Sequence, residues 1–249
     1  MVSFGAAGIE TGIAIINPAE GQWVDSEQVN MILSQAGLKT WKLYESVPDS
    51  HDLREELYQH MDTISSKNTS KNMVLPIDQH FNVKGVGLVA IGYVQSGTVN
   101  KHDEVVILPA KETGVVRSLQ VMDDDVDSAI AGDRVGVALR NLREEALHRG
   151  CMIIHPESQA LFRHDSSKIK IKTAPFQKRK LTNEDVIHAA VDLQFVVGRI
   201  KRIDGDLISV EWENPLWIRA EGSPEILITQ LDTMPMRIIG SCLLYTSDA

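Results

Sequence analysis

Cysteine is scarce in this chain of 249 residues, which contains only Cys151 and Cys242. Neither stands at the spacing of a paired metal site, and two isolated thiols give no disulfide framework, so we expect a reducing, cytoplasmic setting. Long apolar runs are missing as well: the run at residues 13–16 is short, and Glu10 stands shortly before it. We therefore predict neither a signal peptide nor contact with a membrane.

A phosphate-binding loop of the type Gly-x-x-x-x-Gly-Lys-Ser/Thr is also missing from the sequence. In nucleotide hydrolases the backbone amides of this loop hold the phosphates, its lysine bridges them, and its hydroxyl binds magnesium. The histidines are scattered, and none stands at ligand spacing from a cysteine. We therefore predict no catalytic residue, no metal site and no bound cofactor within these residues.

Basic residues are the minority, with 25 Lys and Arg against 34 Asp and Glu, for a formal net charge of −9. A generally basic nucleic-acid binder is excluded, no DNA partner is expected, and any RNA contact must be a local patch. Residues 167–173 alternate lysine with Ile169 and Ile171, as one strand would, and more basic residues follow. The cluster predicts either contact with an RNA backbone or an edge strand protected by lysines. The RNA-backbone candidates are Lys168, Lys170, Lys172, Lys178, Arg179 and Lys180.

What the sequence does contain, between residues 75 and 152, is a series of short segments rich in Val, Ile and Leu. Turn residues separate them at roughly 8–12 residue spacing, as a small β-barrel or sandwich requires. The clearest predicted strands are residues 88–94, 104–108, 115–121 and 135–139.

This stretch resembles the second domain of the elongation factor Tu family of translational GTPases. The matching signals occur in family order: Leu-Pro-Ile-Asp at 75–78, Ser-Gly-Thr-Val at 96–99, Ala-Gly-Asp-Arg-Val-Gly at 131–136 and His-Arg-Gly at 148–150. Within the family the chain resembles most the selenocysteine-specific branch and its archaeal relatives with a degenerate nucleotide-binding domain. The resemblance implies GTP and Mg²⁺ as cofactors only if an intact nucleotide-binding domain precedes this chain.

The predicted fold is multidomain: a truncated GTPase-like α/β domain followed by two small β-barrels. Residues 1–66 are predicted to be the C-terminal part of the α/β domain, with strands at 12–16 and 40–44 and helices starting near Asp25 and Asp49. A polar linker is expected at 67–74. The apolar positions of the second helix, Leu53, Leu57, Met61 and Ile64, share one face.

The two barrels are expected at residues 75–155 and 156–241, and the resemblance relates them to the second and third domains of the family. In the second barrel we predict a strand at 189–200 broken by Gly198 and a tight hairpin at Asp204-Gly205. Residues 242–249 are typical of a translated sequencing adapter in a metagenomic fragment, so we leave them, Cys242 included, out of the predicted fold.

Asn-Lys-His-Asp at residues 100–103 matches the guanine-reading motif Asn-Lys-x-Asp letter for letter. It falls inside a predicted β-hairpin and not after a buried parallel strand, so we interpret it as a turn. The position at which the resemblance places a guanine motif holds Asn-Pro-Ala-Glu at 17–20, which keeps only the asparagine. We therefore predict weak or absent guanine specificity.

The resemblance also implies a shallow pocket on the first barrel for the aminoacylated 3′ end of tRNA. The residues at the matching positions are Asp78, Gln79, Phe81, Gln120 and Arg134. Phe81 would stack on the terminal adenosine, or else belong to the barrel core. Asp78 and Gln79 would meet the ribose, the base edge or the amine, and Arg134 would meet phosphate or ester, or else pair with neighbouring acids.

Some positions depart from the family pattern. Ile91 stands where the family has a small hydroxyl residue, and Gln120 stands where it has a carboxylate. Residues 123–127 put four acids where relatives carry mixed or basic charge, and we interpret them as a solvated acidic loop and not as a cation site. These departures argue against ordinary aminoacyl-tRNA carriage.

Three hypotheses follow for the function. The first is a translation-factor-like protein that binds tRNA or the ribosome through its β-barrels. The second is a GTP-hydrolysing elongation factor of the selenocysteine-specific type whose front is truncated here. The third is a non-catalytic scaffold whose barrels bind a protein partner.

Overall fold

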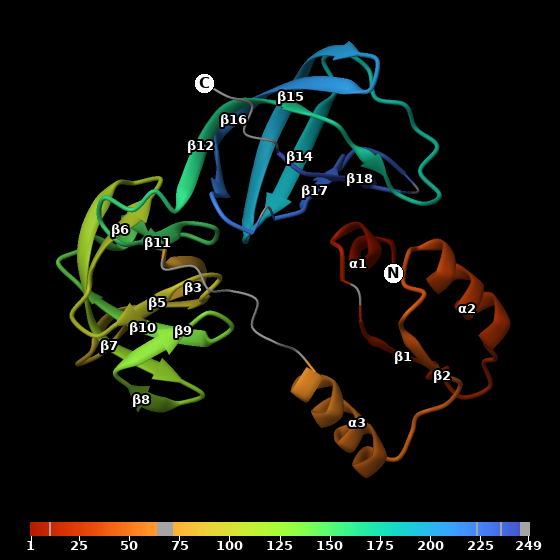
Figure 1. Cartoon of the computed structure of the whole chain (residues 1–249), viewed down its shortest axis with the longest axis horizontal. Coiled ribbons are helices and arrows are strands. Elements are labelled where there is room, and N and C mark those ends of the chain that lie inside the picture. The colour runs from red at the N-terminus through yellow and green to blue at the C-terminus, as the bar shows by residue number, and fades with distance from the viewer. Residues whose placement is uncertain (10, 64–71, 223, 235, 245–249) are drawn as a thin grey trace.

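The computed structural model describes residues 1–9, 11–63, 72–222, 224–234 and 236–244. Three regions follow one another along the chain: a helical region with a small parallel sheet, a closed β-barrel, and a curled β-sheet (Figure 1). This arrangement confirms the predicted fold class. Across the described residues, none of the helices has the length and apolar character needed to span a membrane.

The first region alternates helices and strands, as predicted. Its elements are α1 Val2–Ala6, β1 Ile13–Ile15, α2 Ser26–Gln35, β2 Lys42–Tyr44 and α3 Ser50–Thr63. β1 and β2 pair in parallel, with Ile13 opposite Lys42. The α2 helix begins where predicted, because Asp25 Oδ1 accepts a hydrogen bond from the backbone N–H of Glu27 at 2.9 Å. Gly37 follows the helix with a φ of +84°, which glycine adopts without strain.

The apolar faces of α2 and α3 differ in what they meet. Leu33 on α2 is 2% exposed and packs against a small core that includes Trp41 and Leu43. On α3, by contrast, Leu57 is 47% exposed and Met61 is 62% exposed. The apolar face predicted for α3 is therefore present, but none of its described residues is buried. Ile64 and most of the predicted linker lie outside the described residues.

The closed barrel is built from the stretch that the sequence singled out. Its strands are β3 Val74–Val83, β4 Gly87–Tyr93, β6 Glu104–Leu108, β7 Glu112–Val121, β8 Asp124–Val126, β10 Arg134–Arg140 and β11 Met152–Ile154, with a 3-10 turn at Glu144–Ala146 before β11. In the same stretch, β5 Thr98–Asn100 and β9 Ser128–Ile130 form a separate two-stranded sheet. The sheet runs β10-β4-β3-β11-β6-β7, and β10 pairs with β7 to close the circle. Because successive side chains of a strand point to opposite faces, every second side chain points into the core, where Leu75, Ile107 and Leu119 are fully buried.

The curled sheet follows. Its strands are β12 Leu161–Ile169, β13 Lys172–Thr173, β14 Val186–Val191, β15 Gln194–Asp204, β16 Leu207–Arg219, β17 Ile226–Thr229 and β18 Ile238–Cys242. The order is β12-β16-β15-β14-β17-β18-β13, so β12 and β13, which are neighbours in sequence, form its two opposite edges. The sheet must therefore curl until the short segment between them can join its edges. Its core includes Trp212 and Ile187.

Three sequence predictions need correction in this sheet. Residues 167–173 are not one strand, because β12 ends at Ile169 and β13 pairs with β18. The run at 189–200 breaks at Asp192 and Leu193, which both have positive φ, while Gly198 lies inside β15. The last strand also includes Cys242, which pairs with Ile226. The hairpin at Asp204-Gly205 is confirmed, since β15 ends at Asp204 and β16 begins directly after the turn.

An apolar cluster joins the barrel to the curled sheet. Val74, Met152 and Ile154 of the barrel share it with Ala160 and Trp217 from the second unit. Burial of these side chains holds the two β units together.

Candidate functional site

A hollow of about 590 Å³ lies on the outer face of the barrel, over strands β3, β4, β10 and β7. Two rows of cross-strand partners form its floor. In one row Ile91 lies opposite Gly136, and Gly136 lies opposite Gln120. In the other row, Val89 lies opposite Ala138.

The hollow exists because the central strand carries small residues. Gly136 has no side chain, and a Cβ built there would have Gln120 as its nearest neighbour, at 3.9 Å. Ala138, two residues along β10, points to the same face. Valine and isoleucine on β4 stand beside these small residues, so the floor is apolar and recessed.

The rim of the hollow is polar and predominantly acidic. Gln120 Nε2 donates a hydrogen bond to Asp125 Oδ1 at 3.0 Å. Asp123 and Arg134 line the same hollow, and Arg134 makes no ion pair with another described residue. Met122, in the turn between β7 and β8, is 89% exposed at its edge.

The structure brings three of the five predicted tRNA-binding residues together. Phe81, Gln120 and Arg134 all line the hollow, and Phe81 is 40% exposed, which excludes the alternative of a core residue. Gln79 lies opposite Ile91, at the end of the first row, but does not line the hollow. Asp78 lies at a register shift in β3 and pairs with Arg149.

The Asp78 carboxylate is therefore engaged elsewhere. Its Oδ1 lies 3.4 Å from the guanidinium of Arg149, and the Asp78 side chain is only 21% exposed. Sequence reasoning also missed part of the site, namely the small residues Gly136 and Ala138 and the carboxylate of Asp125. The alternation Arg-Val-Gly-Val-Ala at 134–138 was the available signal, because it puts glycine and alanine on the face away from the core.

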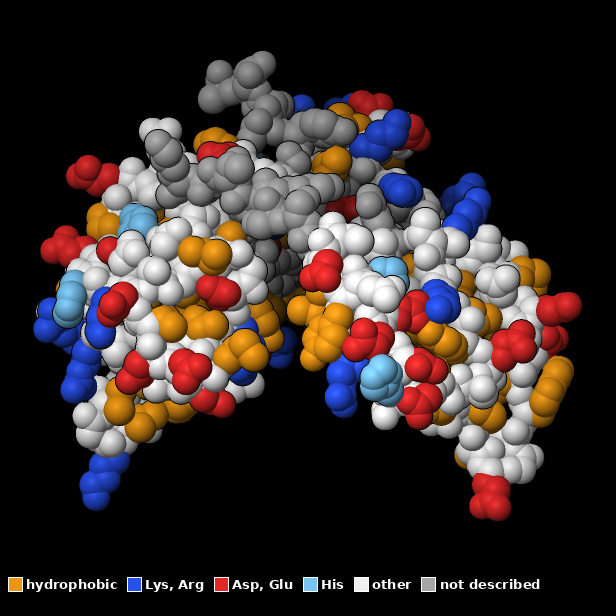
Figure 2. Space-filling model, turned by 60° about the horizontal axis from the view of Figure 1, so that its bottom comes forward, with side chains coloured by type: hydrophobic (Ala, Val, Ile, Leu, Met, Phe, Trp, Pro, Cys, Tyr) orange, Lys and Arg blue, Asp and Glu red, His pale blue; other side chains and the backbone are white. Residues whose placement is uncertain are grey.

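The fold places two lysines of the predicted cluster on two edge strands, which the short segment between them keeps close together. Lys168 on β12 lies opposite Ser209, whereas Lys172 on β13 lies opposite Ser241 at the other edge of the sheet. The alternative interpretation, lysines on edge strands, fits both positions. Acidic and basic side chains are interspersed on the face drawn in Figure 2.

Two of the six basic candidates are already paired. Lys170 Nζ lies 2.9 Å from Asp206, and Arg179 lies 3.2 Å from Asp185. Burial alone would raise the pKa of Asp185, but hydrogen bonds from Thr182 and the guanidinium of Arg179 outweigh it and hold this pKa below its usual value.

Asn100 ends β5, and residues 101–103 form a turn before β6, as interpreted from the sequence. The predicted hairpin is wrong, because β5 pairs with β9 whereas β6 pairs with β7 and β11. Asp103 Oδ2 accepts a hydrogen bond from the backbone N–H of Asn100 at 2.7 Å and lies 3.0 Å from His155 Nε2. A guanine-reading aspartate needs a free carboxylate, so these residues do not fit a guanine nucleotide. Asn17 follows β1, and the residues after it, Pro18, Ala19 and Glu20, include no lysine or aspartate.

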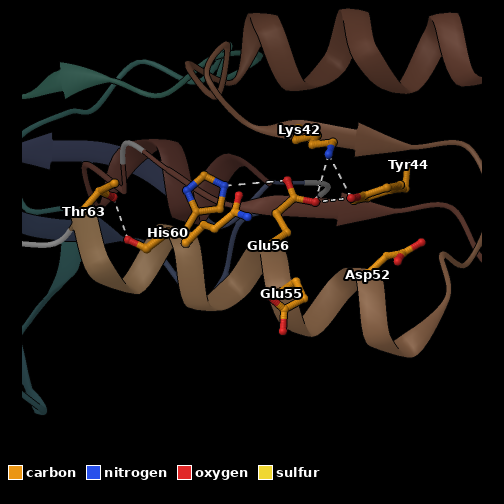
Figure 3. Close-up of a pocket in the computed structure, with 8 residues that line it drawn as sticks. Lys42, Tyr44, Asp52, Glu55, Glu56, His60 and Thr63 are labelled. Atoms are coloured by element: carbon orange, nitrogen blue, oxygen red, sulfur yellow. Dashed lines mark hydrogen bonds and ion pairs between the residues drawn. The ribbon is translucent and has the colours of Figure 1, made fainter.

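A second hollow lies between β2 and α3 (Figure 3). Lys42 Nζ lies 2.9 Å from Glu56 and donates a hydrogen bond to the hydroxyl of Tyr44 at 2.9 Å, and that hydroxyl also contacts Glu56. His60, one turn along α3, lies 3.8 Å from the same carboxylate. The charged groups satisfy one another, so this set serves to attach α3 to the strand.

A family model and several relatives match the chain. The model, described as elongation factor Tu domain 2, matches residues 87–154, which contain most of the barrel with the hollow. An uncharacterized protein of Methanocaldococcus jannaschii is 28% identical over 209 residues, covering 84% of this chain and 64% of that protein. The selenocysteine-specific elongation factor of the same organism is 35% identical over 150 residues, covering 60% of this chain and 32% of that protein.

A solved structure shares the fold. Translation elongation factor SelB from Methanococcus maripaludis, in its apo form, matches with a TM-score of 0.80 at 24% identity, covering 100% of this chain and 60% of that one. The chain therefore spans less than two thirds of the length of each of these proteins. The domain match and the relatives together show that residues 87–154 are an elongation factor Tu domain 2 and that the chain is an elongation-factor-like protein, similar to the elongation factor Tu-like family of translational GTPases.

Proposed function

We propose that this protein holds the aminoacylated 3′ end of a tRNA in the hollow on its β3–β11 barrel. The observation that carries the proposal is the convergence of Phe81, Gln120 and Arg134 on one recessed, apolar floor. Single-stranded RNA ends are recognised in this way, by a stacking ring and polar groups beside a shaped surface.

Each residue has a distinct part in the proposed complex. The half-exposed ring of Phe81 stacks on the terminal adenine. The unpaired guanidinium of Arg134 meets the phosphate that precedes this adenosine, because a planar cation suits phosphate oxygens. The aminoacyl group then lies over Val89, Ile91 and Ala138. The role is binding and positioning, and none of these residues needs to transfer a proton.

The names of the relatives point to protein synthesis, since those that match include selenocysteine-specific elongation factors. The proposal includes no GTP-dependent step, because residues 100–103 do not fit the base and the sequence contains no phosphate-binding loop.

The proposal also includes two β-barrel domains, with boundaries at residues 75–155 and 156–241. We further propose that the curled sheet contacts the backbone of tRNA or of ribosomal RNA. The lysines that would make this contact form no ion pair with another described residue: Lys168, Lys172, Lys178 and Lys180.

A filter-binding experiment tests the proposal. The full chain is mixed with aminoacylated or deacylated tRNA, and with ribosomes, at about 50 mM and about 200 mM salt. We expect aminoacylated tRNA to bind more tightly than deacylated tRNA, and Gly136→Val and Phe81→Ala to weaken its binding by about tenfold or more. Phe162→Ala is the matched control, because Phe162 on β12 is 44% exposed, belongs to the other sheet and does not line the hollow.

The outcomes separate the hypotheses. Equal affinity for both forms of tRNA, unchanged by Gly136→Val, would show that the hollow does not receive the aminoacyl end. Absence of tRNA and ribosome binding at the lower salt concentration would reject the RNA-binding function and leave the protein-binding scaffold.

A further inference from the structure

We infer that the hollow selects aminoacyl groups with an apolar side chain and rejects those with an acidic side chain. This inference rests on the proposed function and adds the chemical class of the amino acid. It is carried by the apolar floor, the placement of the carboxylates on the rim, and the position of Arg134.

The floor offers mainly apolar contact, and Ser118, which lies opposite Ala138, is the polar residue in its second row. Val89, Ile91 and Ala138 are adjacent across β4 and β10, and all three line the hollow. A hydrophobic side chain placed there removes apolar surface of both partners from water. A charged or strongly polar side chain would lose its water without gaining a hydrogen-bonding partner from these three residues.

The carboxylates on the rim are negatively charged and therefore repel an acidic side chain of the ligand. Asp123 and Asp125 both line the hollow, on the turn and strand that follow β7. The nearest amide donor, Gln120 Nε2, already donates to Asp125 at 3.0 Å. A ligand carboxylate in the hollow would therefore face two carboxylates, with one of the two amide N–H groups of Gln120 already engaged, which disfavours its ionised form. An ammonium group, such as the free α-amine of an aminoacyl ester, is favoured by the same rim.

Arg134, the one Lys or Arg among the described residues that line the hollow, is placed to serve another part of the ligand. Arg134 lies opposite Tyr93, one cross-strand row beyond the pair of Ile91 and Gly136. It stands at the start of β10, two residues before Gly136, and lines the hollow. In the proposed complex it is engaged by phosphate, so it does not compensate an acidic side chain. The hollow thus combines attraction for apolar groups with repulsion of acidic ones, the two parts of a specific site.

The test measures the affinity of the full chain for three 3′-aminoacylamido-3′-deoxyadenosines by titration calorimetry. The probes carry leucyl, asparaginyl and aspartyl groups, of which the last two have the same shape and differ in charge. We expect the leucyl compound to bind most tightly and the aspartyl compound to bind about tenfold or more weaker than the asparaginyl one. Asp125→Asn should bring the aspartyl and asparaginyl affinities within about threefold of each other.

A matched variant locates the effect. Asp124→Asn removes the same charge from the neighbouring position on β8, which does not line the hollow. We expect this variant to leave the ratio of aspartyl to asparaginyl affinities unchanged. An equal change in both variants would assign the discrimination to the overall charge of the hairpin and overturn the inference.

The remaining outcomes distinguish the inference from the function on which it rests. Three equal affinities that are all lost in Gly136→Val would overturn the selectivity while leaving the aminoacyl site in place. Preference for the aspartyl compound would overturn it in the same way. Absence of binding by all three compounds would reject the site itself, and the inference with it.

Discussion

Ile91 on β4 and Gly136 on β10 are direct cross-strand partners, so a branched apolar side chain lies beside a position that has no side chain. This pairing makes the outer face of the barrel concave at the point where Phe81 and Arg134 also converge. A convex or flat barrel surface would offer only a platform for stacking. The concave surface adds room for a group attached to the end of a nucleic acid.

Gly92 and Gly136 lie on neighbouring strands but should respond in opposite ways to alanine. A Cβ on Gly92 would lie 2.2 Å from the carbonyl oxygen of Pro76, whereas a Cβ on Gly136 meets nothing closer than 3.9 Å. We expect Gly92→Ala to destabilise the barrel by about 1–3 kcal/mol or more. Gly136→Ala should leave it unchanged or up to about 1 kcal/mol more stable. Urea unfolding of the two variants side by side measures the difference, and equal stabilities would contradict the packing described for β4.

The ion pair between Arg219 and Asp192 should matter far more than the exposed pairs. Arg219 Nε donates to Asp192 Oδ2 at 2.7 Å, and the two side chains are 16% and 6% exposed. Arg219→Met leaves the carboxylate without its partner, so we expect a loss of about 3–5 kcal/mol. The control is Arg202→Met, whose pair with Asp204 is exposed and should contribute at most about 1 kcal/mol. Losses of similar size in urea unfolding would show that the Arg219 pair is solvated.

Acid should loosen α3 through Glu56. The hydrogen bond from Tyr44 first, and then that from Lys42, hold the pKa of the Glu56 carboxyl below its ordinary value of 4.5. Because this pKa is lowered in the folded chain, its contribution to stability is complete above about pH 4.5 and is lost as the pH falls through the folded value.

Hydrogen exchange of the α3 amides at pH 6 and at pH 3.5 measures this effect, after correction for the intrinsic pH dependence of exchange. Protection should fall at the lower pH in the wild-type chain, and Glu56→Gln should show low protection at both values. An unchanged protection of wild-type α3 would mean that the contacts of Glu56 do not hold the helix.

The thiol of Cys151 should be inert in the folded protein. It is fully buried, and this burial raises its pKa to about 11. Because only the thiolate reacts, we expect a disulfide reagent at pH 8 to label it roughly two orders of magnitude more slowly than in denaturant. The measurement uses Cys242→Ser, so that a single thiol is followed. Rapid labelling of the native chain would contradict the closed core of the barrel.

The barrel strands could be predicted from sequence because their apolar residues alternate between two turns, as they do in β4 and β10. The turn between β14 and β15 could not, because Asp192 and Leu193 both adopt positive φ without a glycine or asparagine to indicate it. Gly205, by contrast, indicated the next hairpin directly, and its φ is +60°.

The site was predicted only in part for a related reason. Phe81, Gln120 and Arg134 could be placed by resemblance, but the role of Gly136 depends on the register of three strands, which no local pattern reveals. Asp78 lies outside the hollow: β3 shifts its register between Ile77 and Gln79, and the Asp78 carboxylate lies 3.4 Å from the Arg149 guanidinium.

The most direct test of the proposed site is methyl NMR on the full chain, with the isoleucine, valine and alanine methyl groups labelled. On addition of 3′-leucylamido-3′-deoxyadenosine, we expect the methyl signals of Ile91, Val89 and Ala138 to shift, and Gly136→Val to abolish these shifts. Shifts confined to the β12–β18 sheet or to α2 and α3, with the signals of the hollow unmoved, would contradict the proposal that this barrel receives the aminoacyl end.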